Sequence, residues 1–425
     1  SQNLHSILKL ETDVLPCLVE MKWRGVKINE DHVVVLEKKF KHIYDKCLES
    51  VKKQTGIFPE VWAARSIAKV CEHLGIKDYE RTPITQAPSF TKNWLSNHSN
   101  RTLRNIASAR TADKLRSTFI ETIKNYVVNG KIHADINQLK GDQGGTLTGR
   151  LSYARPNLQQ LPNYNDFGTG IRSLFLPNSK EERWGCFDYS QQEPRLVVHY
   201  ALRTPGITGI SDIAQEYKAK DSTADFHELV AKLANMDRRD AKTINLGLFY
   251  GMGQAKLQTQ LGINSEVEAK ALIRKYHHKV PFVKQLMNSV MDRAQDSGQI
   301  RTIGGRLCRF NKWEPKDWDR RDLYDTWEEA SRENGSGNVK RAFTYKALNR
   351  LIQGSAADMT KKAMINLFKE NICPLIQLHD ELNISIENPE QADKVVKIME
   401  EAIPLEIPNK VDYENGENWG SIDKE

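Results

Sequence analysis

Paired cysteines are the first feature that this sequence lacks. Its six cysteines are scattered and none forms a Cys-x-x-Cys pair, which argues against a zinc ribbon and against a framework of disulfides. The pattern predicts reduced, buried thiols, as in proteins of a reducing compartment. The six positions are Cys17, Cys47, Cys71, Cys186, Cys308 and Cys373.

Long apolar runs are also missing. No stretch approaches the roughly 18 apolar residues of a membrane-spanning helix. The amino terminus lacks the charged, apolar and small-residue succession of a secretory signal. We therefore expect no membrane partner. The chain begins with Ser1 rather than methionine, which favours processing or trimming at this end.

Extremes of composition are absent as well. Hydrophobic residues make up 39% and charged residues 28% of the 425 positions, and neither repeats nor low-complexity segments occur. A chain of this length can bury a sizeable core and form two or three structural units. The net charge of +7 favours a polyanionic partner without proving one, and cationic residues crowd positions 238–242 and 340–350.

Helical periodicity is what the first 130 residues do contain. An early helix should carry Leu15, Leu18, Val19 and Met21 on one face. A second helix should run to Lys52 with Asp31 as its N-cap, and a third should span residues 102–128.

Strand patterns begin after residue 130. They occur at residues 132–136, 171–176, 183–188 and, as a clear hairpin, 372–386. The stretch 203–346 returns to helix, and within it the highly charged segment 311–338 holds three tryptophans and reads as a surface excursion without an evident role. These patterns predict a sheet assembled from two distant parts of the chain, with a helical insert between them and a helical arm before them.

Two aspartates stand where predicted strands end. Asp188 closes the strand 183–188, and Asp380 lies between the two strands of the hairpin. A lone aspartate at a strand end is usually a turn former. A pair that meets across neighbouring strands can instead clamp two divalent ions roughly 3.5–4 Å apart, the arrangement that phosphoryl transfer uses. Mg²⁺ prefers such carboxylate oxygens and keeps water and phosphate as its other ligands.

A cationic helix is predicted between the two aspartates. Arg238, Lys242, Leu246 and Tyr250 recur every four residues and so share one face. Cations at this spacing usually just face water. The end of this helix places two aromatic residues beside two glycines, Gly247 and Gly251. Such a run is harder to explain as a solvent-exposed surface, and it favours the close approach of a polyphosphate and a base.

Taken together, these strings resemble DNA polymerase family A, the group of bacterial DNA polymerase I and its bacteriophage relatives. The resemblance covers nearly the whole chain. The segments that carry it are Arg81–Ser89, Thr148–Ser152, Pro156–Pro162, Ile171–Phe175, Asp188–Arg195, Arg238–Gly251, Gln353–Asp358, Gln377–Leu382 and Gly416–Trp419.

The resemblance implies an α+β right-hand polymerase fold, with an antiparallel palm sheet, a helical thumb and helical fingers. It assigns residues 1–130 to the thumb, 131–202 to the first part of the palm, 203–346 to the fingers and 347–425 to the second part of the palm. The exonuclease that usually precedes the thumb in this family is not matched, so the chain is expected to be the polymerase portion alone.

The resemblance also assigns roles to single residues. Asp188 and Asp380 would ligate two Mg²⁺ ions, for which Mn²⁺ could substitute, and Glu381 would be a supporting catalytic carboxylate. Glu193 would exclude a ribose 2′-hydroxyl and so select deoxynucleotides. Residues assigned to the deoxynucleoside triphosphate are Gln191, Glu193, His227, Arg238, Lys242, Leu246 and Tyr250. Residues assigned to the primer-template DNA are Arg150, Arg172, Asn349, Gln353 and His379.

Four positions depart from the family pattern. Leu246 stands where an aromatic residue is usual, which puts packing against the incoming sugar in question. Gln192 and Pro194 replace apolar residues. Tyr345 stands where bacterial members place an arginine that contacts DNA, and Arg341 or Lys346 could substitute for it. These departures favour a phage-like member.

The function expected on these grounds is template-directed addition of deoxynucleotides to a primer 3′ end, with release of pyrophosphate, by a monomer in the cytoplasm of a bacterial or phage-infected cell. One alternative is a single-subunit RNA polymerase, against which Glu193 speaks. Another is a catalytically silent DNA-binding clamp, against which both aspartates and the triphosphate cations speak.

Overall fold

The computed structural model describes residues 3–142, 144–162, 165–219, 224–249, 252, 254–263, 265–317 and 322–422. The chain forms two compact units. The first comprises Ser1–Arg24, Asp135–Ala154 and Gly185–Glu414, and the second comprises Gly25–Ala134, Arg155–Trp184 and Asn415–Glu425. Each unit has its own hydrophobic core.

A four-stranded sheet is the centre of the first unit. Its strands lie in the order β12 (Ile376–Leu378), β13 (Glu381–Ile386), β7 (Arg183–Tyr189) and β14 (Val411–Gly416). β12 and β13 form an antiparallel hairpin in which Leu378 pairs with Glu381. The expected hairpin and the expected strand 183–188 are thereby confirmed, and the sheet does join distant parts of the chain.

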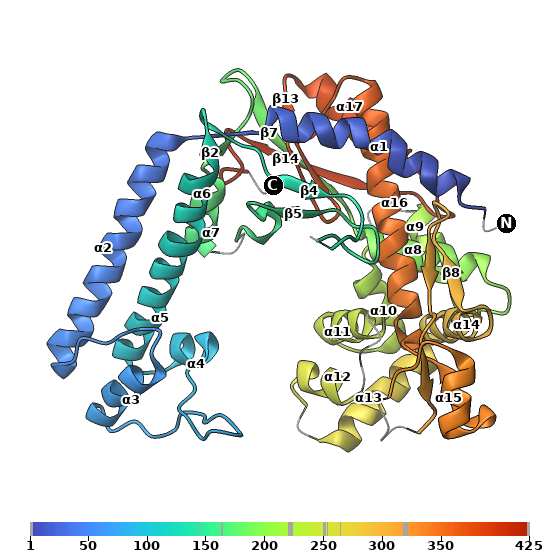
Figure 1. Ribbon diagram of the computed structural model, residues 1–425, viewed down its shortest axis with the longest axis horizontal. Helices are drawn as coiled ribbons and strands as arrows, with labels where there is room; N and C mark the ends of the chain where they lie inside the picture. The colour runs from blue at the N-terminus through green and yellow to red at the C-terminus, as the bar shows by residue number, and fades with distance from the viewer. Residues whose placement is uncertain are drawn as a thin grey trace. The chain divides into compact units, whose positions relative to one another are not determined.

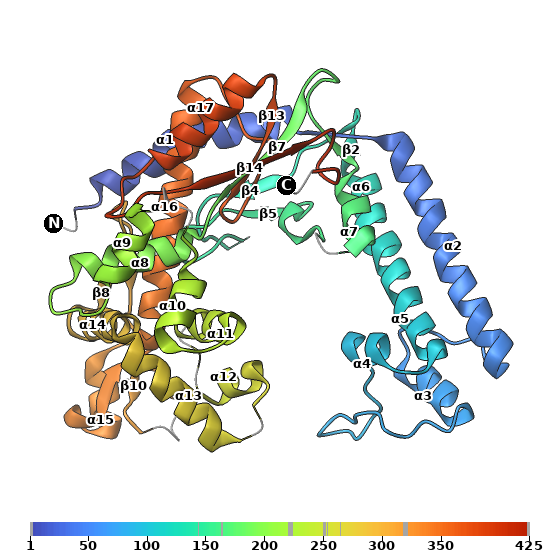
Figure 2. The ribbon, with the colours of Figure 1, turned by 180° about the vertical axis from the view of Figure 1, so that it is seen from behind.

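Helix α16 (Ala347–Lys369) is the main helix of this unit. Most residues of α16 are small or apolar and are buried. Four helices pack against them: α1 (His5–Arg24), α8 (Gln192–Arg203), α14 (Pro281–Ser297) and α17 (Pro389–Glu400). Figures 1 and 2 show α1 crossing α16. On α1 the buried face is Val14, Cys17, Leu18 and Met21, whereas the expected face residues Leu15 and Val19 are exposed.

The region expected to be helical, 203–346, is only partly so. Its first part contains α9 (Ser211–Ala219), α10 (Phe226–Ala234), α11 (Arg238–Phe249), α12 (Gln254–Leu261) and α13 (Glu266–Lys279). After α14, however, come two antiparallel pairs, β8 (Gln299–Arg301) with β9 (Leu307–Arg309) and β10 (Trp313–Pro315) with β11 (Val339–Arg341).

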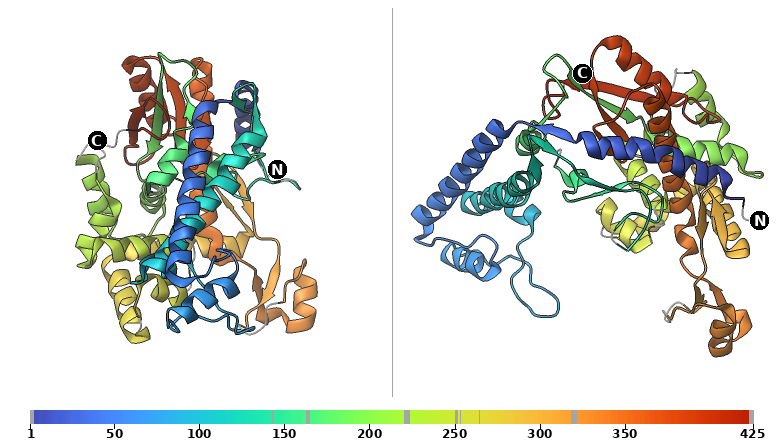
Figure 3. Two further views of the ribbon diagram at one scale, coloured as in Figure 1. Left: turned by 90° about the vertical axis from the view of Figure 1, so that its left-hand side faces the viewer. Right: turned by 45° about the horizontal axis from the view of Figure 1, so that its top comes forward.

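The tryptophan-rich segment forms a small substructure. α15 (Trp327–Asn334) packs on the β10–β11 pair, and Tyr324, Ala330 and Val339 make a separate apolar cluster with Trp313 at its edge. In the right-hand view of Figure 3 this orange-brown segment stands off from the rest of its unit. It is therefore a surface excursion, as expected.

The second unit is built on two long antiparallel partners. α2 (Glu30–Thr55) lies beside α5 (Arg101–Lys114), and α3 (Ala64–His73) and α4 (Lys92–Asn97) lie at one end of the pair (Figure 1). A small sheet in the order β2 (Val127–Val128), β3 (Lys131–Ile132), β1 (Val26–Ile28), β6 (Phe175–Leu176) completes the unit with α7 (Asn165–Arg172).

Several sequence-based boundaries were wrong. The N-cap of α2 is Asn29, whose Oδ1 accepts from the His32 amide, so Asp31 lies in the first turn instead. The helix expected over 102–128 is confirmed over Arg101–Tyr126, with a π-helical turn at Leu115–Ile120 between α5 and α6 (Glu121–Tyr126), and only Val127–Val128 is a strand instead. Most of the strand expected at 171–176 is the end of α7 and a turn, with only Phe175–Leu176 extended.

The single strand expected at residues 132–136 is divided between two sheets. Ile132 pairs with Val26 in β1, whereas Asp135 begins β4 (Asp135–Asn137) and pairs with Ala154 of β5 (Ser152–Ala154). The alternation at 132–136 therefore reflects two short strands. The division into thumb, palm and fingers stays a prediction, and α1 differs from it by grouping with the first unit. None of the helices in the described residues has the length and apolar composition that crossing a membrane requires.

Candidate active site

The two aspartates that the sequence singled out lie on neighbouring strands. Asp188 is near the end of β7, and Asp380 is in the turn between β12 and β13, the strand that borders β7. The Tyr189 amide donates a hydrogen bond of 3.3 Å to the Asp380 carbonyl, which fixes the end of β7 against the turn. The structure thus brings Asp188 and Asp380 together from positions almost 200 residues apart.

Local backbone geometry presents the turn. His379 has φ = 58°, a left-handed conformation that lets β12 reverse tightly into β13. Its carbonyl accepts from the buried Gln377 amide nitrogen at 2.5 Å. His379 itself is exposed at the tip.

The electrostatics of this carboxylate pair are unfavourable in the absence of a cation. Desolvation by the surrounding protein, followed by the negative charges of Asp380 and Glu381, raises the pKa of Asp188 to about 8. Burial likewise raises the pKa of Asp380, although Arg150 opposes the shift. The two carboxyls therefore repel each other, as like charges at one site do.

A divalent cation would relieve this repulsion. Among the described residues no side chain donates a hydrogen bond to the carboxylate of Asp188 or Asp380. In the same part of the chain no group of three or more His, Cys, Asp or Glu side chains is placed to hold a metal by itself. Two open carboxylates fit an ion such as Mg²⁺, which completes its shell with water and substrate oxygens.

Glu381 lies close to Asp188, but its carboxylate accepts a hydrogen bond from its own strand. Its carboxylate accepts from the Asn383 side chain at 2.5 Å, and Asn383 in turn accepts from the Cys186 thiol. Glu381 therefore contributes negative charge to Asp188 while being held in place by its own strand.

Arg150 and Glu193, which the sequence assigned to different ligands, form an ion pair. The Arg150 Nη2–Glu193 Oε1 distance is 2.6 Å, and both side chains are largely buried. Glu193 lies in the first turn of α8, directly after β7, and both charges act on Asp380. The structure thus places this pair next to the carboxylates.

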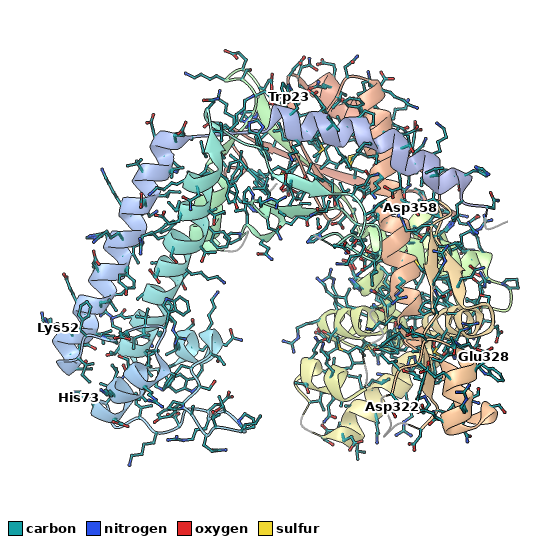
Figure 4. The ribbon with its side chains drawn as sticks, viewed as in Figure 1. Trp23, Lys52, His73, Asp322, Glu328 and Asp358 are labelled. Atoms are coloured by element: carbon teal, nitrogen blue, oxygen red, sulfur yellow. The ribbon has the colours of Figure 1, made fainter. Side chains whose placement is uncertain are left out.

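The turn that carries Arg150 rests on a buried arginine. Gly149 has φ = 83°, and a Cβ on it would lie 2.4 Å from the Arg306 guanidinium carbon. Arg306 is bound by Asp358 of α16, at 2.9 Å, and by Glu11 of α1. Figure 4 labels Asp358 on α16. Sequence analysis missed these supports, since nothing in the pattern links residues so far apart.

Gln191 holds the entry to α10. It has a left-handed backbone before α8, and its Oε1 accepts from the Phe226 amide at 2.7 Å while its amide nitrogen donates to the Ala224 carbonyl. A nucleotide-binding residue expected from the sequence is thus engaged in the protein itself, where it positions the start of α10.

His227, Arg238 and Lys242 come from two adjoining helices. His227 is buried on α10 and contacts Asn245 of α11 through its Nδ1, at 3.1 Å. Desolvation, with further contributions from Lys242 and Arg238 against Asp225, lowers the pKa of His227 to about 4. Arg238 binds Asp225, the N-cap of α10, at 2.5 Å, and Lys242 is exposed one turn further on.

The rest of the cationic helix is partly described. Leu246 is half-buried on the same face, whereas Tyr250 and Gly251 lie outside the described residues. Gly247 is buried, and a Cβ on it would lie 2.8 Å from Leu257 of α12. Its glycine is therefore explained by helix packing rather than by the approach of a ligand.

Two of the residues assigned to DNA share a face of α16. Asn349 and Gln353 are one turn apart, half-buried, and make no side-chain hydrogen bond within the described residues. Nearby, Tyr345 is 48% exposed and Lys346 lies over its ring. Arg341 is instead committed to the Gln295 and Phe310 carbonyls, so it is not free to replace the missing arginine.

Arg172 belongs to the second unit. Its guanidinium lies 4.4 Å from the centre of the Trp419 ring, and Nε donates to the Pro162 carbonyl at 3.2 Å. Trp419 is also stacked on Trp184. Arg172 therefore supports the core of that unit.

Comparison with known proteins identifies the family. The sequence model of DNA polymerase family A matches residues 31–421. A DNA-directed DNA polymerase of Pseudomonas phage M6 is 34% identical, over 99% of this chain and 66% of that protein. DNA polymerase I of Geobacillus stearothermophilus is 34% identical, over 75% of this chain and 34% of that protein.

A solved structure agrees. The POL domain of Pol1 from M. smegmatis, in complex with DNA primer-template and dNTP, superposes with a TM-score of 0.75 and 26% identity, over 96% of this chain and 70% of that one. This match confirms the α+β polymerase fold. The chain spans about two thirds of the phage relative and about one third of the bacterial one. The resemblance drawn from the motifs is confirmed, and the chain belongs to DNA polymerase family A, a family of template-directed, divalent-metal-dependent DNA polymerases.

Proposed function

We propose that this chain adds deoxynucleotides to the 3′ end of a DNA primer under the direction of a template strand and releases pyrophosphate. The observation that carries the proposal is the meeting of Asp188 and Asp380 on adjacent strands, with open carboxylates and mutual repulsion. Support comes from the relative named a DNA-directed DNA polymerase and from the similar structure solved with DNA primer-template and dNTP.

Asp188 and Asp380 would hold the divalent ions, and Glu381 would add negative charge beside them. When bound, two Mg²⁺ ions would lower the pKa of the primer 3′-hydroxyl and neutralise charge on the phosphate under attack. Mn²⁺ has similar ligand preferences and is the expected substitute.

The remaining residues would bind the triphosphate, position the helix that contacts it and exclude a ribose 2′-hydroxyl. Lys242 and Arg238 would neutralise the triphosphate, with His227 as a further contact, because phosphate groups favour clustered cations and N–H donors. Gln191 would position the helix that carries His227, while Leu246 and Tyr250 would border the insertion site. Glu193, fixed by Arg150, would leave no room for a 2′-hydroxyl.

The primer-template would contact residues at the edge of this site. Asn349 and Gln353 offer amides without internal partners in the described residues, and His379 is exposed beside the carboxylates. Arg150 and Arg172 are the arginines proposed to contact DNA. We further propose a monomer acting in the cytoplasm of a bacterial or phage-infected cell, as the origins of the relatives suggest.

The test is extension of a labelled primer with Mg²⁺ and either deoxy- or ribonucleotides. Wild type should extend with deoxynucleotides only, and Asp188→Asn should abolish extension while preserving DNA binding. Asp412→Asn is a matched control, because Asp412 also adds negative charge near Asp188 but is not a proposed ligand. It should retain extension.

Other outcomes would contradict specific parts of the proposal. Ribonucleotide extension at a comparable rate would favour a single-subunit RNA polymerase and overturn the role of Glu193. Tight primer-template binding without extension by wild type would favour a silent clamp. Extension by Asp188→Asn at the wild-type rate would remove Asp188 from the metal site.

A further inference from the structure

Three helices of the first unit meet at His227. α10 packs against both α11 and α13, and the three lie next to one another in Figures 1 and 2. Lys275 of α13 also donates to the Asn235 carbonyl at the C-terminal end of α10, at 2.6 Å. Side chains at this junction are therefore held by three separate elements.

A hydrogen-bonded chain runs through the junction. The Tyr276 hydroxyl of α13 donates to Asn245 Oδ1 of α11, and the Asn245 amide nitrogen lies 3.1 Å from His227 Nδ1 of α10. Tyr276 and Asn245 are completely buried, and His227 is 7% exposed. In such a place each polar hydrogen needs an acceptor.

The number of hydrogen-bond donors determines which way the Asn245 side-chain amide is turned. Burial raises the pKa of Tyr276, so its hydroxyl keeps its proton, and among the described residues Asn245 is its only acceptor. Asn245 must therefore turn Oδ1 to the tyrosine and its NH₂ group to the histidine. If the amide were reversed, the tyrosine proton would be buried without an acceptor, at a cost of about 1–3 kcal/mol.

The same direction fixes the histidine tautomer. His227 Nδ1 receives a hydrogen bond from Asn245 and so must carry a lone pair, which leaves the proton on Nε2. The charged groups near the ring are Asp225 at the start of α10 and Arg238 and Lys242 on α11. Burial and the two cations lower the pKa of His227, and Asp225 raises it. The net result is a pKa of about 4, so the ring is neutral at pH 7.

We propose that Asn245 and Tyr276 are positioning residues that hold His227 as a neutral, Nε2-protonated ring, so that it donates a hydrogen bond to the incoming triphosphate without adding a charge. The inference rests on the proposed function and specifies how this one residue serves it. Arg238 and Lys242 already supply positive charge at this face. A neutral N–H donor instead orients the triphosphate, because a hydrogen bond requires a nearly linear arrangement of donor, hydrogen and acceptor.

Nitrogen-15 NMR of histidine-labelled wild type tests the tautomer directly. The chain has 11 histidines, and the His227 signals are assigned by their loss in His227→Gln. At pH 7.5 we expect the proton on Nε2 and none on Nδ1. A proton on Nδ1, or on both nitrogens, would overturn the inference. This readout does not depend on catalysis, so it stands even if wild type fails to extend a primer and the proposed function falls.

Tyr276→Phe tests the positioning role. Without the hydroxyl, Asn245 is free to turn Oδ1 towards His227, which moves the histidine proton to Nδ1 and leaves a lone pair facing the phosphates. We expect the KM for deoxynucleotide to rise roughly tenfold at pH 8, the loss of one hydrogen bond to a charged group, with kcat little changed. Nitrogen-15 NMR of the labelled variant should show the His227 proton on Nδ1 at pH 7.5.

Tyr200→Phe is the matched control. It removes one hydroxyl that hydrogen-bonds to Ser355 at 2.6 Å in the same unit but has no link to His227. Its KM should stay at the wild-type value throughout. An unchanged KM in Tyr276→Phe would overturn the positioning role, and so would a raised KM with the His227 proton still on Nε2, since a packing defect does not move that proton. If Tyr276→Phe fails to fold, the NMR measurement on wild type decides alone.

Discussion

At the residue scale, Glu193 is the side chain with the most specific expected task. Its carboxylate is pinned by Arg150 at 2.6 Å, so it cannot swing away from a substrate that presses on it. Replacement with alanine removes both the bulk and the anchor of Arg150. We predict that Glu193→Ala raises the rate of ribonucleotide incorporation relative to deoxynucleotide by roughly 10–100-fold, measured as the ratio of kcat/KM values.

Glu193→Gln separates volume from charge. Glutamine keeps the size of the side chain and can still accept from Arg150 through its amide oxygen. If steric exclusion selects the sugar, Glu193→Gln should discriminate nearly as well as wild type. Equal loss of discrimination in both variants would show that the negative charge, rather than the bulk, excludes ribonucleotides.

Single residues also show what sequence could and could not reveal. Asp188 and Asp380 were found because a carboxylate at a strand end is visible in a linear pattern, and the strand order then brings the two together. Asn245 and Tyr276 were not, because their importance lies in a contact between α11 and α13 that no periodicity encodes. The Arg150–Glu193 pair was likewise seen as two separate residues.

At the scale of elements, buried charges join α1, α16 and the turn between β8 and β9. Glu11 binds Lys361 at 2.8 Å and also Arg306, and Arg306 binds Asp358. Burial alone would raise the pKa of Glu11, but Lys361 and Arg306 outweigh it and lower the pKa. Asp358 is fully buried and also accepts from Thr302 at 2.5 Å and from the Gly304 amide.

Removing one partner from such a cluster leaves an uncompensated buried charge. We predict that Asp358→Asn lowers the free energy of unfolding by about 3 kcal/mol, measured by denaturant titration. The variant should also weaken primer-template binding, since Arg306 supports the turn that carries Arg150. Asp13→Asn, which breaks the solvent-exposed pair with Lys9 on α1, should leave the unfolding midpoint nearly unchanged. Equal effects of the two substitutions would contradict a structural role for the cluster.

Element boundaries were predicted less well than element types. The hairpin was correct because apolar residues alternate along β13, and the strand 183–188 was correct because residues 184–187 are a short apolar run, as in a strand buried on both faces. The helix at 102–128 was correct to within two residues, although the π-helical turn at Leu115–Ile120 inside it was not foreseen, since such a turn keeps apolar residues in nearly helical spacing. The strands after residue 298 were missed because each has only three residues, too few for alternation to show.

At the scale of the whole molecule, charge is unevenly distributed along the chain. The net charge is +7, yet the segment 311–338 around α15 has more acidic than basic residues. In the second unit, a groove of about 460 Å³ along α4 and α5 is lined by Lys92, Arg101 and Arg104 together with small polar side chains. Basic and hydroxyl side chains in one groove are the groups that bind a phosphate backbone.

This distribution predicts how binding responds to salt. Primer-template affinity should fall steeply as salt rises from 50 to 200 mM, by roughly a thousandfold if about six phosphates are neutralised. Arg101→Gln should reduce the slope of log affinity against log salt by about 1. Arg101 is exposed and makes no side-chain hydrogen bond within the described residues, so its loss should not disturb the fold.

A control of opposite sign tests whether location or total charge matters. Glu329→Gln in α15 makes the protein more positive by one charge, but at the acidic segment rather than at the basic groove. If DNA lies along the groove, Glu329→Gln should leave both the affinity and the salt slope at wild-type values. If the slope instead follows net charge, Glu329→Gln should strengthen binding about as much as Arg101→Gln weakens it. Because the salt slope counts the phosphates that Lys and Arg neutralise, and Glu329 is not one of these cations, the local outcome is the expected one.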